Sequence, residues 1–220
     1  MAETTSKTTK TSQSTKQTSR RTNQELREVS ITRIHDAALS LFVRNGFAAT
    51  TIEQIASAAK LTKGGVYFYI NKKELLLLEI VETIKRRYVE DFVQMNNGLT
   101  GSAQDRLVAL MHWQVNFARE NPREIMLLVL LSITKEVSFK PVLQTISTIY
   151  RMIQDIVAEI IEEGQARGEI ATWMKKQEFA AFFVAAHDGM MIEWYRRKKE
   201  IDGKEFVRVW RELTLRGLKP

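Results

Sequence analysis

Apolar residues recur at helical spacing along nearly the whole chain from Ser30 onward, and this period limits the folds open to the chain. The first apolar face combines Ile34, Ala38 and Leu41. No useful length of sequence alternates apolar and polar residues as a half-buried strand does. We therefore expect an all-α protein without a sheet.

Turn and capping residues divide this pattern into about nine helices. Asn45-Gly46 ends the first helix, the capping box of Thr50 and Glu53 starts a second, and Thr62 starts a short third. Asn71 is expected to start a fourth helix that runs to about residue 95. Five further helices are expected at about 103–119, 122–133, 140–167, 175–199 and 204–217.

Positive charge is concentrated toward the N-terminus. The formal net charge is +7, and most of the excess lies in the N-terminal half. Residues 1–28 are rich in Thr and Ser, poor in apolar residues, and carry several Lys and Arg. We expect them to form a disordered basic arm. The charge indicates a polyanion partner, and a solvated basic surface is the alternative.

Several classes of protein are excluded or disfavoured. The chain has no cysteine, which excludes disulfides, thiolate chemistry and Cys-ligated zinc. The longest apolar run, residues 125–131, is roughly a third of the length that a bilayer crossing needs. The N-terminus lacks the apolar core of a signal peptide. We expect a cytoplasmic protein with no membrane contact, associated with the nucleoid when it binds DNA.

Three helices within about 40 residues, the last two joined by a tight turn, have the dimensions of a helix-turn-helix. Such a unit places its last helix, here residues 62–69 (TKGGVYFY), in a major groove of DNA. Its two adjacent glycines cost about 1 kcal/mol each relative to alanine, a cost that close approach of the backbone to DNA would explain. Lys63 and Tyr67 share one helical face, and Val66 and Ile70 should point into the core. Lys73, near the start of the next helix, could bind a phosphate.

Residues 31–80 resemble the DNA-binding domain of the tetracycline-repressor (TetR) family, through the stretches AALSLFVRNGFAATTIEQIASAA and LTKGGVYFYINKKELLL. The resemblance implies that Lys63 and Tyr67 read bases and that Phe68 packs under the recognition helix. Lys60 replaces a usual turn glycine, which should strain that turn. The full set of DNA-binding residues implied by the resemblance is Thr51, Thr62, Lys63, Gly64, Gly65, Tyr67, Tyr69 and Lys73.

The resemblance also divides the chain and implies two further sites. It predicts a helix-turn-helix domain over 29–77 and a helical ligand-binding and dimerisation domain over 78–220. The effector pocket is predicted from adaptable Met and aromatic side chains, for each of which ordinary core is the alternative. These pocket residues are Phe92, Met95, Met111, Trp113, Phe117, Met126, Phe183 and Met190.

The last two helices carry more aromatic surface than one small domain can bury, which favours a four-helix dimer interface. The alternative is that they close only the monomer's own core. The predicted interface residues are Phe182, Ala186, Gly189, Trp194, Phe206 and Trp210.

No catalytic or metal-binding constellation is evident. His112 and His187 each stand alone on their helices, and the side chains of His187 and Asp188 should diverge because the two are adjacent. We find no nucleophile–base pair, metal-ligand cluster or phosphate loop, so we expect no catalytic residue, no metal and no cofactor.

The expected function is that of a DNA-binding transcriptional regulator. In this interpretation the protein is a homodimeric repressor that binds a palindromic double-stranded DNA operator and is released by a small apolar or amphipathic effector. The alternatives are a ligand-independent regulator or activator and, more remotely, an enzyme that uses the helical cavity.

Overall fold

The computed structural model describes residues 9–197 and 200–220, and within them every regular element is an α-helix. The predicted all-α class is therefore confirmed for the described residues. The helices are α1 (Thr9–Asn45), α2 (Ile52–Ala58), α3 (Lys63–Tyr69), α4 (Lys73–Asn97), α5 (Ala103–Glu120), α6 (Pro122–Ile133), α7 (Lys140–Ala166), α8 (Lys176–Arg197) and α9 (Gly203–Gly217).

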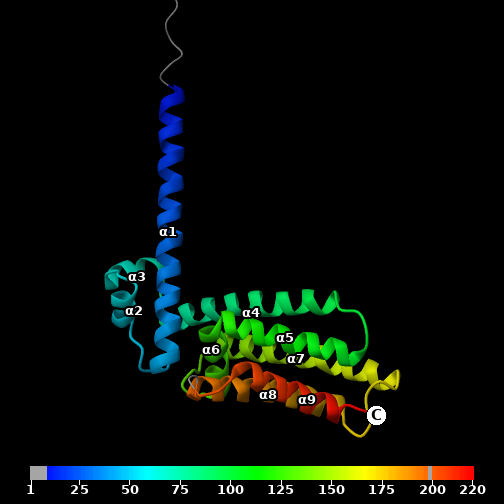
Figure 1. Ribbon diagram of the computed structural model, residues 1–220. Helices are drawn as coiled ribbons and strands as arrows, with labels where there is room; N and C mark the ends of the chain where they lie inside the picture. The colour runs from blue at the N-terminus through cyan, green and yellow to red at the C-terminus, as the bar shows by residue number, and fades with distance from the viewer. Residues whose placement is uncertain (1–8, 198–199) are drawn as a thin grey trace, which may run out of the picture.

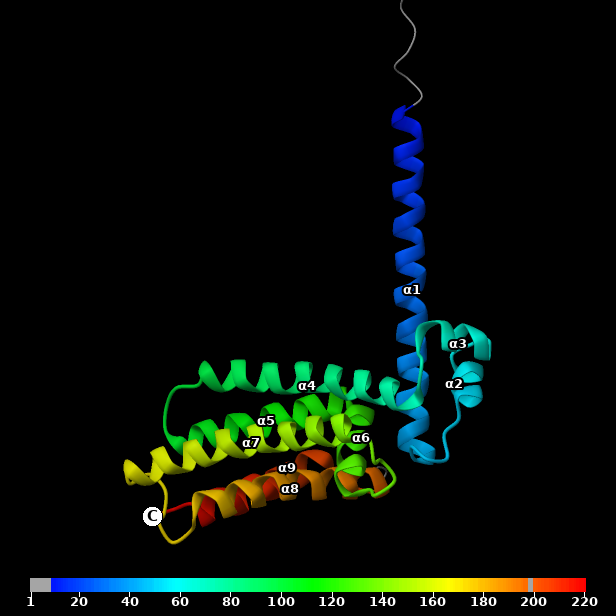
Figure 2. The same ribbon diagram turned by 180° about the vertical axis from the view of Figure 1, so that it is seen from behind.

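The helices form two parts that share α4 (Figures 1 and 2). Helices α2 and α3 lie beside the C-terminal part of α1 and form a three-helix unit with it. Helices α4 to α9 form a bundle, in which α4 packs against α5 and α7, and α7 packs against α8. Helix α6 packs against α1 and so joins the bundle to the three-helix unit.

Helix α1 extends much further toward the N-terminus than we expected. Residues 9–28, which we expected to be disordered, are helical, and residues 1–8 lie outside the described residues. Residues 9–28 contain neither proline nor glycine. Nothing in their sequence therefore interrupts a helix that propagates from the packed turns of the three-helix unit. This part of α1 projects beyond α3 and away from the bundle (Figure 1).

The start of α2 differs by one residue from the prediction. Thr51, not Thr50, caps the helix: its hydroxyl oxygen accepts a hydrogen bond from the N–H of Gln54 at 3.2 Å, and the Gln54 side chain accepts one from the N–H of Thr51 at 2.9 Å. Thr50 is fully buried, and its hydroxyl donates to the carbonyl of Gly46 at 2.8 Å. The predicted cap residue is thus used to close the preceding turn.

Lys60 has a left-handed backbone, with φ of 58°, which confirms the strain predicted at this turn. The turn is a Schellman motif, in which the N–H of Leu61 bonds to the carbonyl of Ala56 at 2.9 Å and the N–H of Lys60 to that of Ser57 at 3.1 Å. Glycine is the usual residue at this position because it has no Cβ to clash. The motif sets the angle between α2 and α3, so it holds α3 in place despite the strained lysine.

Helix α4 crosses the predicted domain boundary at residue 77 without a break. Its N-cap residue is Lys72 rather than Asn71, and no side chain caps it. The first turns bury Leu76 and Leu77, and later turns bury Tyr88 and Phe92. One continuous helix therefore contributes to both parts of the molecule.

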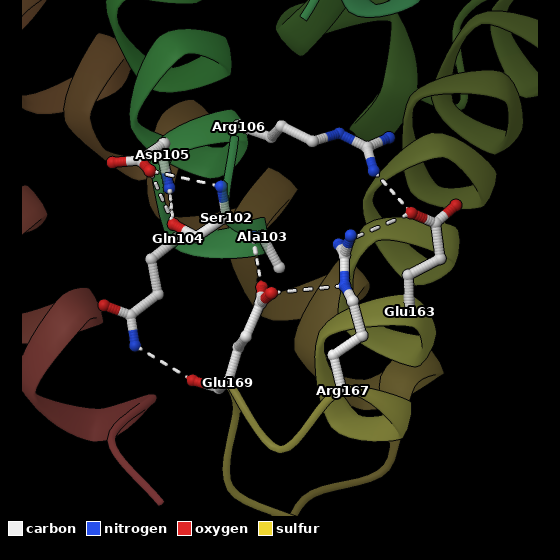
Figure 3. Close-up of polar contacts among 8 residues, drawn as sticks. All are labelled: Ser102, Ala103, Gln104, Asp105, Arg106, Glu163, Arg167 and Glu169. Carbon is white, nitrogen blue, oxygen red and sulfur yellow. Dashed lines mark hydrogen bonds and ion pairs between the residues drawn. The ribbon is translucent and has the colours of Figure 1, made fainter. Parts of the chain in front are cut away.

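The far end of the bundle is closed by polar contacts between α5 and the C-terminal end of α7 (Figure 3). A carboxylate oxygen of Glu169 accepts a hydrogen bond from the N–H of Ala103, at 2.7 Å, in the first turn of α5. The Arg106 guanidinium reaches the Glu163 carboxylate at 2.6 Å. The packing around Gly164 is also very tight here: a Cβ added at Gly164 would lie 2.6 Å from Ala103 Cβ and 2.6 Å from Ile170 Cδ1.

We expect Gly164→Ala to lower the free energy of unfolding by ~1–3 kcal/mol, because the extra methyl overpacks this junction. Chemical denaturation followed by circular dichroism measures the change. Gly203→Ala is the control, since a Cβ at Gly203 meets nothing within 4 Å. Equal stabilities for the two variants would contradict the close approach of α5 and α7.

Candidate nucleic-acid interface and ligand cleft

Helix α3 separates a buried face from an exposed one. Its N-cap is Thr62, whose hydroxyl oxygen accepts a hydrogen bond from the N–H of Gly65 at 3.0 Å. Val66 and Ile70 are buried, which confirms their predicted inward orientation. Lys63 and Gly64 are exposed, together with Tyr67, and a Cβ added at Gly64 would meet nothing within 4 Å. The backbone at Gly64 is therefore open to close contact by a second molecule.

Lys63 is held by a carboxylate from α2. Its ammonium forms an ion pair with Glu53, and both side chains are more than half exposed. The hydrogen bond from Lys63 lowers the pKa of Glu53, and Glu53 in turn raises the pKa of Lys63. Lys63 also lies 6.0 Å from the ring centroid of Tyr67. Both groups predicted to read bases thus share one surface, with an acidic group beside them.

The prediction that Phe68 packs under α3 is wrong. Its side chain is 79% exposed, and its ring makes an edge contact with Tyr69, at 5.1 Å between centroids. Ile70 is the residue buried beneath the end of α3. Phe68 lies next to Tyr67 in sequence and adds an apolar group to the exposed side of α3. The expectation came from the family resemblance, whereas the helical spacing that buries Val66 and Ile70 leaves Phe68 on the exposed side.

Lys73 has structural partners where we predicted a phosphate. Its ammonium donates hydrogen bonds to the carbonyls of Phe47 and Thr50, each at 2.7 Å, and to that of Ala48 at 3.4 Å. It also lies 4.3 Å from the ring centroid of Phe47. An ammonium has three donors, so these bonds occupy all of them. Lys73 fastens the loop between α1 and α2 to the start of α4.

Three other predicted DNA-binding residues are accessible to different degrees. Thr51 is exposed at the start of α2, although its hydroxyl already caps that helix. Tyr69 and Gly65 are half-buried at α3. Their contacts with DNA stay predictions.

Most of the predicted pocket residues form packed core. Phe92, Met111, Phe117, Met126 and Phe183 are buried. Three rings pack tightly with a fourth, Tyr88: the Tyr88 ring centroid lies 5.0 Å from that of Trp113 and 4.8 Å from that of Phe117, and the Phe92 and Trp113 centroids are 5.1 Å apart. Met95 is half-buried beside this core.

A cleft of about 860 Å³ lies between α5, α8 and the start of α9, and Met190 is the member of the predicted pocket that lines it. Its wall combines apolar side chains with a group of basic side chains. The apolar residues are Val115, Ala118, Met190, Met191, Trp194, Phe206 and Val207. The basic residues are His112, Arg119, His187, Lys204, Arg208 and Arg211.

The negative groups near this cleft are largely neutralised. Asp202 caps α9 and accepts hydrogen bonds from the N–H groups of Lys204 and Glu205, at 3.0 and 3.4 Å. Arg208 pairs with Glu205, at 2.8 Å from Nε to the carboxylate. Among the described side chains, Arg119 and Lys204 form no ion pair. The cleft therefore has an apolar wall and unpaired positive charge, a combination that suits an amphipathic anion.

A second, internal cavity of about 20 Å³ is lined by residues of α4, α5, α6, α7 and α8. Its polar residues are Tyr88, Gln114, Tyr150, His187 and Asp188. Sequence reasoning missed this group, because its members come from four helices and each looks like an isolated polar residue in its own pattern. The expectation that His187 and Asp188 diverge is wrong, since His187 Nδ1 lies 3.5 Å from Asp188 Oδ1.

The predicted dimer-interface residues fall into three groups. Phe182 and Gly189 are exposed, and Ala186 is half-buried. Trp194 and Phe206 line the cleft. Trp210 is buried within the monomer, where its ring centroid lies 5.3 Å from that of Phe183.

Other exposed apolar residues extend the surface that α8 and α9 present. On α9, Val209 is 42% exposed and Leu213 is 68% exposed, whereas Trp210 and Thr214 point inward. Val209 and Leu213 are four residues apart and so share one face of α9, next to the face that carries the buried residues. Within the described residues, no cluster of three metal-ligating side chains is present. No described helix has both the length and the apolar character that crossing a membrane would need.

Residues 34–80 match the family described as bacterial regulatory proteins, tetR family. An uncharacterised HTH-type transcriptional regulator of Bacillus subtilis (strain 168), YerO, is 46% identical over 50 residues, or 23% of this chain. That match takes in only 17% of the length of YerO.

Solved structures extend the similarity beyond this segment. The MbdR regulator from Azoarcus sp. CIB is 33% identical, with a TM-score of 0.80, over 87% of this chain and 100% of that one. AibR, solved in complex with isovaleryl coenzyme A and operator DNA, is 17% identical with a TM-score of 0.71, over 84% of this chain and 97% of that one, and so shares the fold. The similarity in the first of these spans both the helix-turn-helix and the bundle, and the chain belongs to the tetR family of bacterial regulatory proteins.

Proposed function

We propose that the protein is a transcriptional repressor that binds a palindromic DNA operator as a homodimer. The observation that carries this proposal is the exposed face of α3, where Lys63, Tyr67 and the open backbone at Gly64 lie together. A helix in a major groove needs polar side chains that reach base edges and a backbone that can approach closely. Thr51, Thr62, Gly65 and Tyr69 would add contacts around it. We place this activity in the cytoplasm, at the nucleoid.

The dimer is proposed to form through the outer faces of α8 and α9. Phe182, Val209 and Leu213 are exposed there, while another face of each helix is buried in the monomer. Two copies related by a twofold axis would bury this apolar surface in a four-helix arrangement. Their recognition helices would need to lie about 34–36 Å apart to enter successive major grooves.

The effector is proposed to be an amphipathic anion, and specifically a coenzyme A thioester. The cleft between α5, α8 and α9 supplies unpaired cations at Arg119 and Lys204 for phosphate groups and an apolar wall for an acyl group. The complex of AibR with isovaleryl coenzyme A and operator DNA supports this class, because that protein shares the fold.

Release of DNA would be transmitted through α4. Tyr88 lies in the bundle interior, 15 residues after Lys73, or roughly 22 Å along the helix. Lys73 holds the loop before α2, so a shift of α4 would change the position of the whole three-helix unit. The effector need favour the released state by only a few kcal/mol. A ligand-independent regulator is the second candidate, favoured by the tight aromatic packing around Tyr88.

Gly64→Ala tests the DNA-binding surface. We expect the change to stabilise the fold by about 0.5–1 kcal/mol, because alanine is the better helix residue and its methyl group has free space. We expect it to weaken DNA binding about tenfold or more, equivalent to ~1.4 kcal/mol, because that space is where DNA approaches. Fluorescence anisotropy on a duplex selected by the wild-type protein from a random pool measures the affinity.

Gly98→Ala is the matched control, since it makes the same change at the C-terminal end of α4, away from α3, with its Cβ 3.6 Å from the Met95 carbonyl. It should leave DNA affinity unchanged. A Gly64→Ala protein that binds the selected duplex as tightly as the wild type would contradict the proposed surface.

Glu53→Gln should tighten DNA binding by several-fold. The change removes a carboxylate that would face phosphates and frees Lys63 from its ion pair. The slope of log affinity against log salt concentration should steepen by up to about 0.9, the value for one additional phosphate contact. Glu159→Gln makes the same charge change on an exposed position of α7 and should have little effect. Weaker binding by Glu53→Gln would place Glu53 outside the DNA interface.

Leu213→Glu should dissociate the dimer without unfolding the monomer, because the side chain is 68% exposed in the monomer and would be buried only in the dimer. Sedimentation velocity at micromolar concentration reports the mass. Trp173→Glu is the control, because Trp173 is 77% exposed but lies in the loop between α7 and α8. If Leu213→Glu sediments as the wild type does, α9 is not in the interface.

A further inference from the structure

The internal cavity holds more unsatisfied polar groups than a packed core needs. We propose that it recognises a hydroxyl group carried on the acyl part of the effector, whose anionic part occupies the cleft. This inference rests on the proposed function and specifies the chemistry of its ligand. It concerns Tyr88, Gln114, Tyr150, His187 and Asp188.

Two buried atoms in this cavity lack hydrogen-bond partners. Gln114 is 1% exposed; its amide nitrogen donates to the Tyr88 hydroxyl at 3.1 Å, but its carbonyl oxygen has no partner. His187 is 5% exposed, and its Nε2 has no partner either. An unsatisfied buried polar group costs about 1–3 kcal/mol. A ligand that supplies both a donor and an acceptor would remove this cost.

The charge of the cavity selects a neutral group over an anionic one. Asp188 accepts a hydrogen bond from the Tyr150 hydroxyl at 2.9 Å, and its side chain is largely buried. Burial raises the pKa of both Tyr88 and Tyr150, and the charge of Asp188 raises each further, so both phenols stay protonated. No lysine or arginine lines this cavity. The basic side chain in its lining is His187, whose Nδ1 already lies 3.5 Å from Asp188, so a carboxylate or phosphate would have to compete with Asp188 for it.

The size of the cavity fits one small polar group. Its volume is about 20 Å³, and a water-sized group needs roughly 10–15 Å³ by this measure. The remaining wall is apolar and comes from Ile125, Leu128, Val129, Ile149, Ile153 and Val184. A hydroxyl at the end of, or along, an apolar acyl chain matches a polar spot within an apolar wall.

His187 connects this cavity with the cleft. It lines both, and it is the residue that the two share. A ligand in the cleft therefore lies on one side of the imidazole and the polar group on the other. A thioester whose phosphates lie near Arg119 or Lys204 would keep its acyl chain in the cleft and direct only its hydroxyl group past His187 into the small cavity. The unpaired Nε2 of His187 would hydrogen-bond the ligand at this boundary.

Binding here would also act directly on α4. Tyr88 belongs to α4, and its hydroxyl bonds to Gln114 of α5. A ligand hydroxyl beside the free carbonyl oxygen of Gln114 would compete for or reorganise this bond. The ring of Tyr88 lies against Trp113 and Phe117 of α5. A movement of Tyr88 would therefore change how α4 packs on α5.

The test measures binding of four probes to the full-length protein by isothermal titration calorimetry: octanoyl-CoA, 3-hydroxyoctanoyl-CoA, 8-hydroxyoctanoyl-CoA and free coenzyme A. We expect at least one hydroxylated thioester to bind about tenfold or more tightly than octanoyl-CoA, because it satisfies buried groups that the plain chain leaves unpaired. The same thioester should release the selected DNA duplex at a correspondingly lower concentration.

Gln114→Leu should abolish the preference for the hydroxylated thioester, since it removes the unpaired carbonyl oxygen. Gln94→Leu, the same change at an exposed position of α4, should retain the preference. The comparison among probes in the wild-type protein stands even if Gln114→Leu fails to fold.

The outcomes separate this inference from the proposed effector class. If all three thioesters bind the wild type with equal affinity, the cavity reads no hydroxyl and holds a structural water at most, while the thioester effector stands. If the hydroxyl preference persists in Gln114→Leu, the group is recognised elsewhere and the assignment is overturned. If no thioester binds a protein that still binds DNA, both the effector class and this inference fail.

Discussion

Helix α4 has to satisfy two hydrophobic cores at once, and the arrangement of the molecule depends on this constraint. Its first turns bury Leu76 and Leu77, and its later turns bury Tyr88 and Phe92 within the bundle. A packed helix moves as a stiff body, because its backbone hydrogen bonds and close-packed side chains resist local deformation. Lys73 extends this constraint to the loop before α2 through its bonds to the Phe47 and Thr50 carbonyls. The position of α3 is thus tied to the packing of the bundle.

The bundle interior combines this rigid packing with polar groups that a hydrophobic core does not need. Gln114 and His187 are buried with unpaired atoms, and Asp188 is close beside them. Burying such groups costs free energy, and apolar residues of similar volume would pack without that cost. These costly polar groups lie next to a cation-lined cleft, and this is the physical reason for assigning ligand recognition to this region. Tyr88 belongs both to this group and to α4. A ligand bound here would therefore act on the same helix that positions α3.

Local signals predicted the helices well and their detailed contacts less well. The ends of α5, α6 and α9 lie within a residue of the predicted positions, because Pro122 and the glycine breaks act through local backbone geometry and Asp202 caps α9 through its own side chain. The predicted cap of α2 was wrong by one residue, because both Thr50 and Thr51 can cap a helix. Thr50 closes the turn at Gly46 through its hydroxyl group, which leaves Thr51 as the cap. The helix over residues 9–28 was missed because low apolar content was taken to mean disorder, although no residue there breaks a helix.

The sequence by itself determined the helical class, the helix-turn-helix and the family, since each follows from short-range periodicity, capping and motif spacing within about 50 residues. Tertiary structure alone decided which side chains share a cavity. Most of the Met and aromatic residues that looked suited to a pocket are core, whereas the polar residues around the internal cavity come from separate helices. Spacing along one helix specifies a face, but the neighbours of that face are set by how helices pack. That packing buried Trp210 inside the monomer and left Phe68 exposed beside Tyr67.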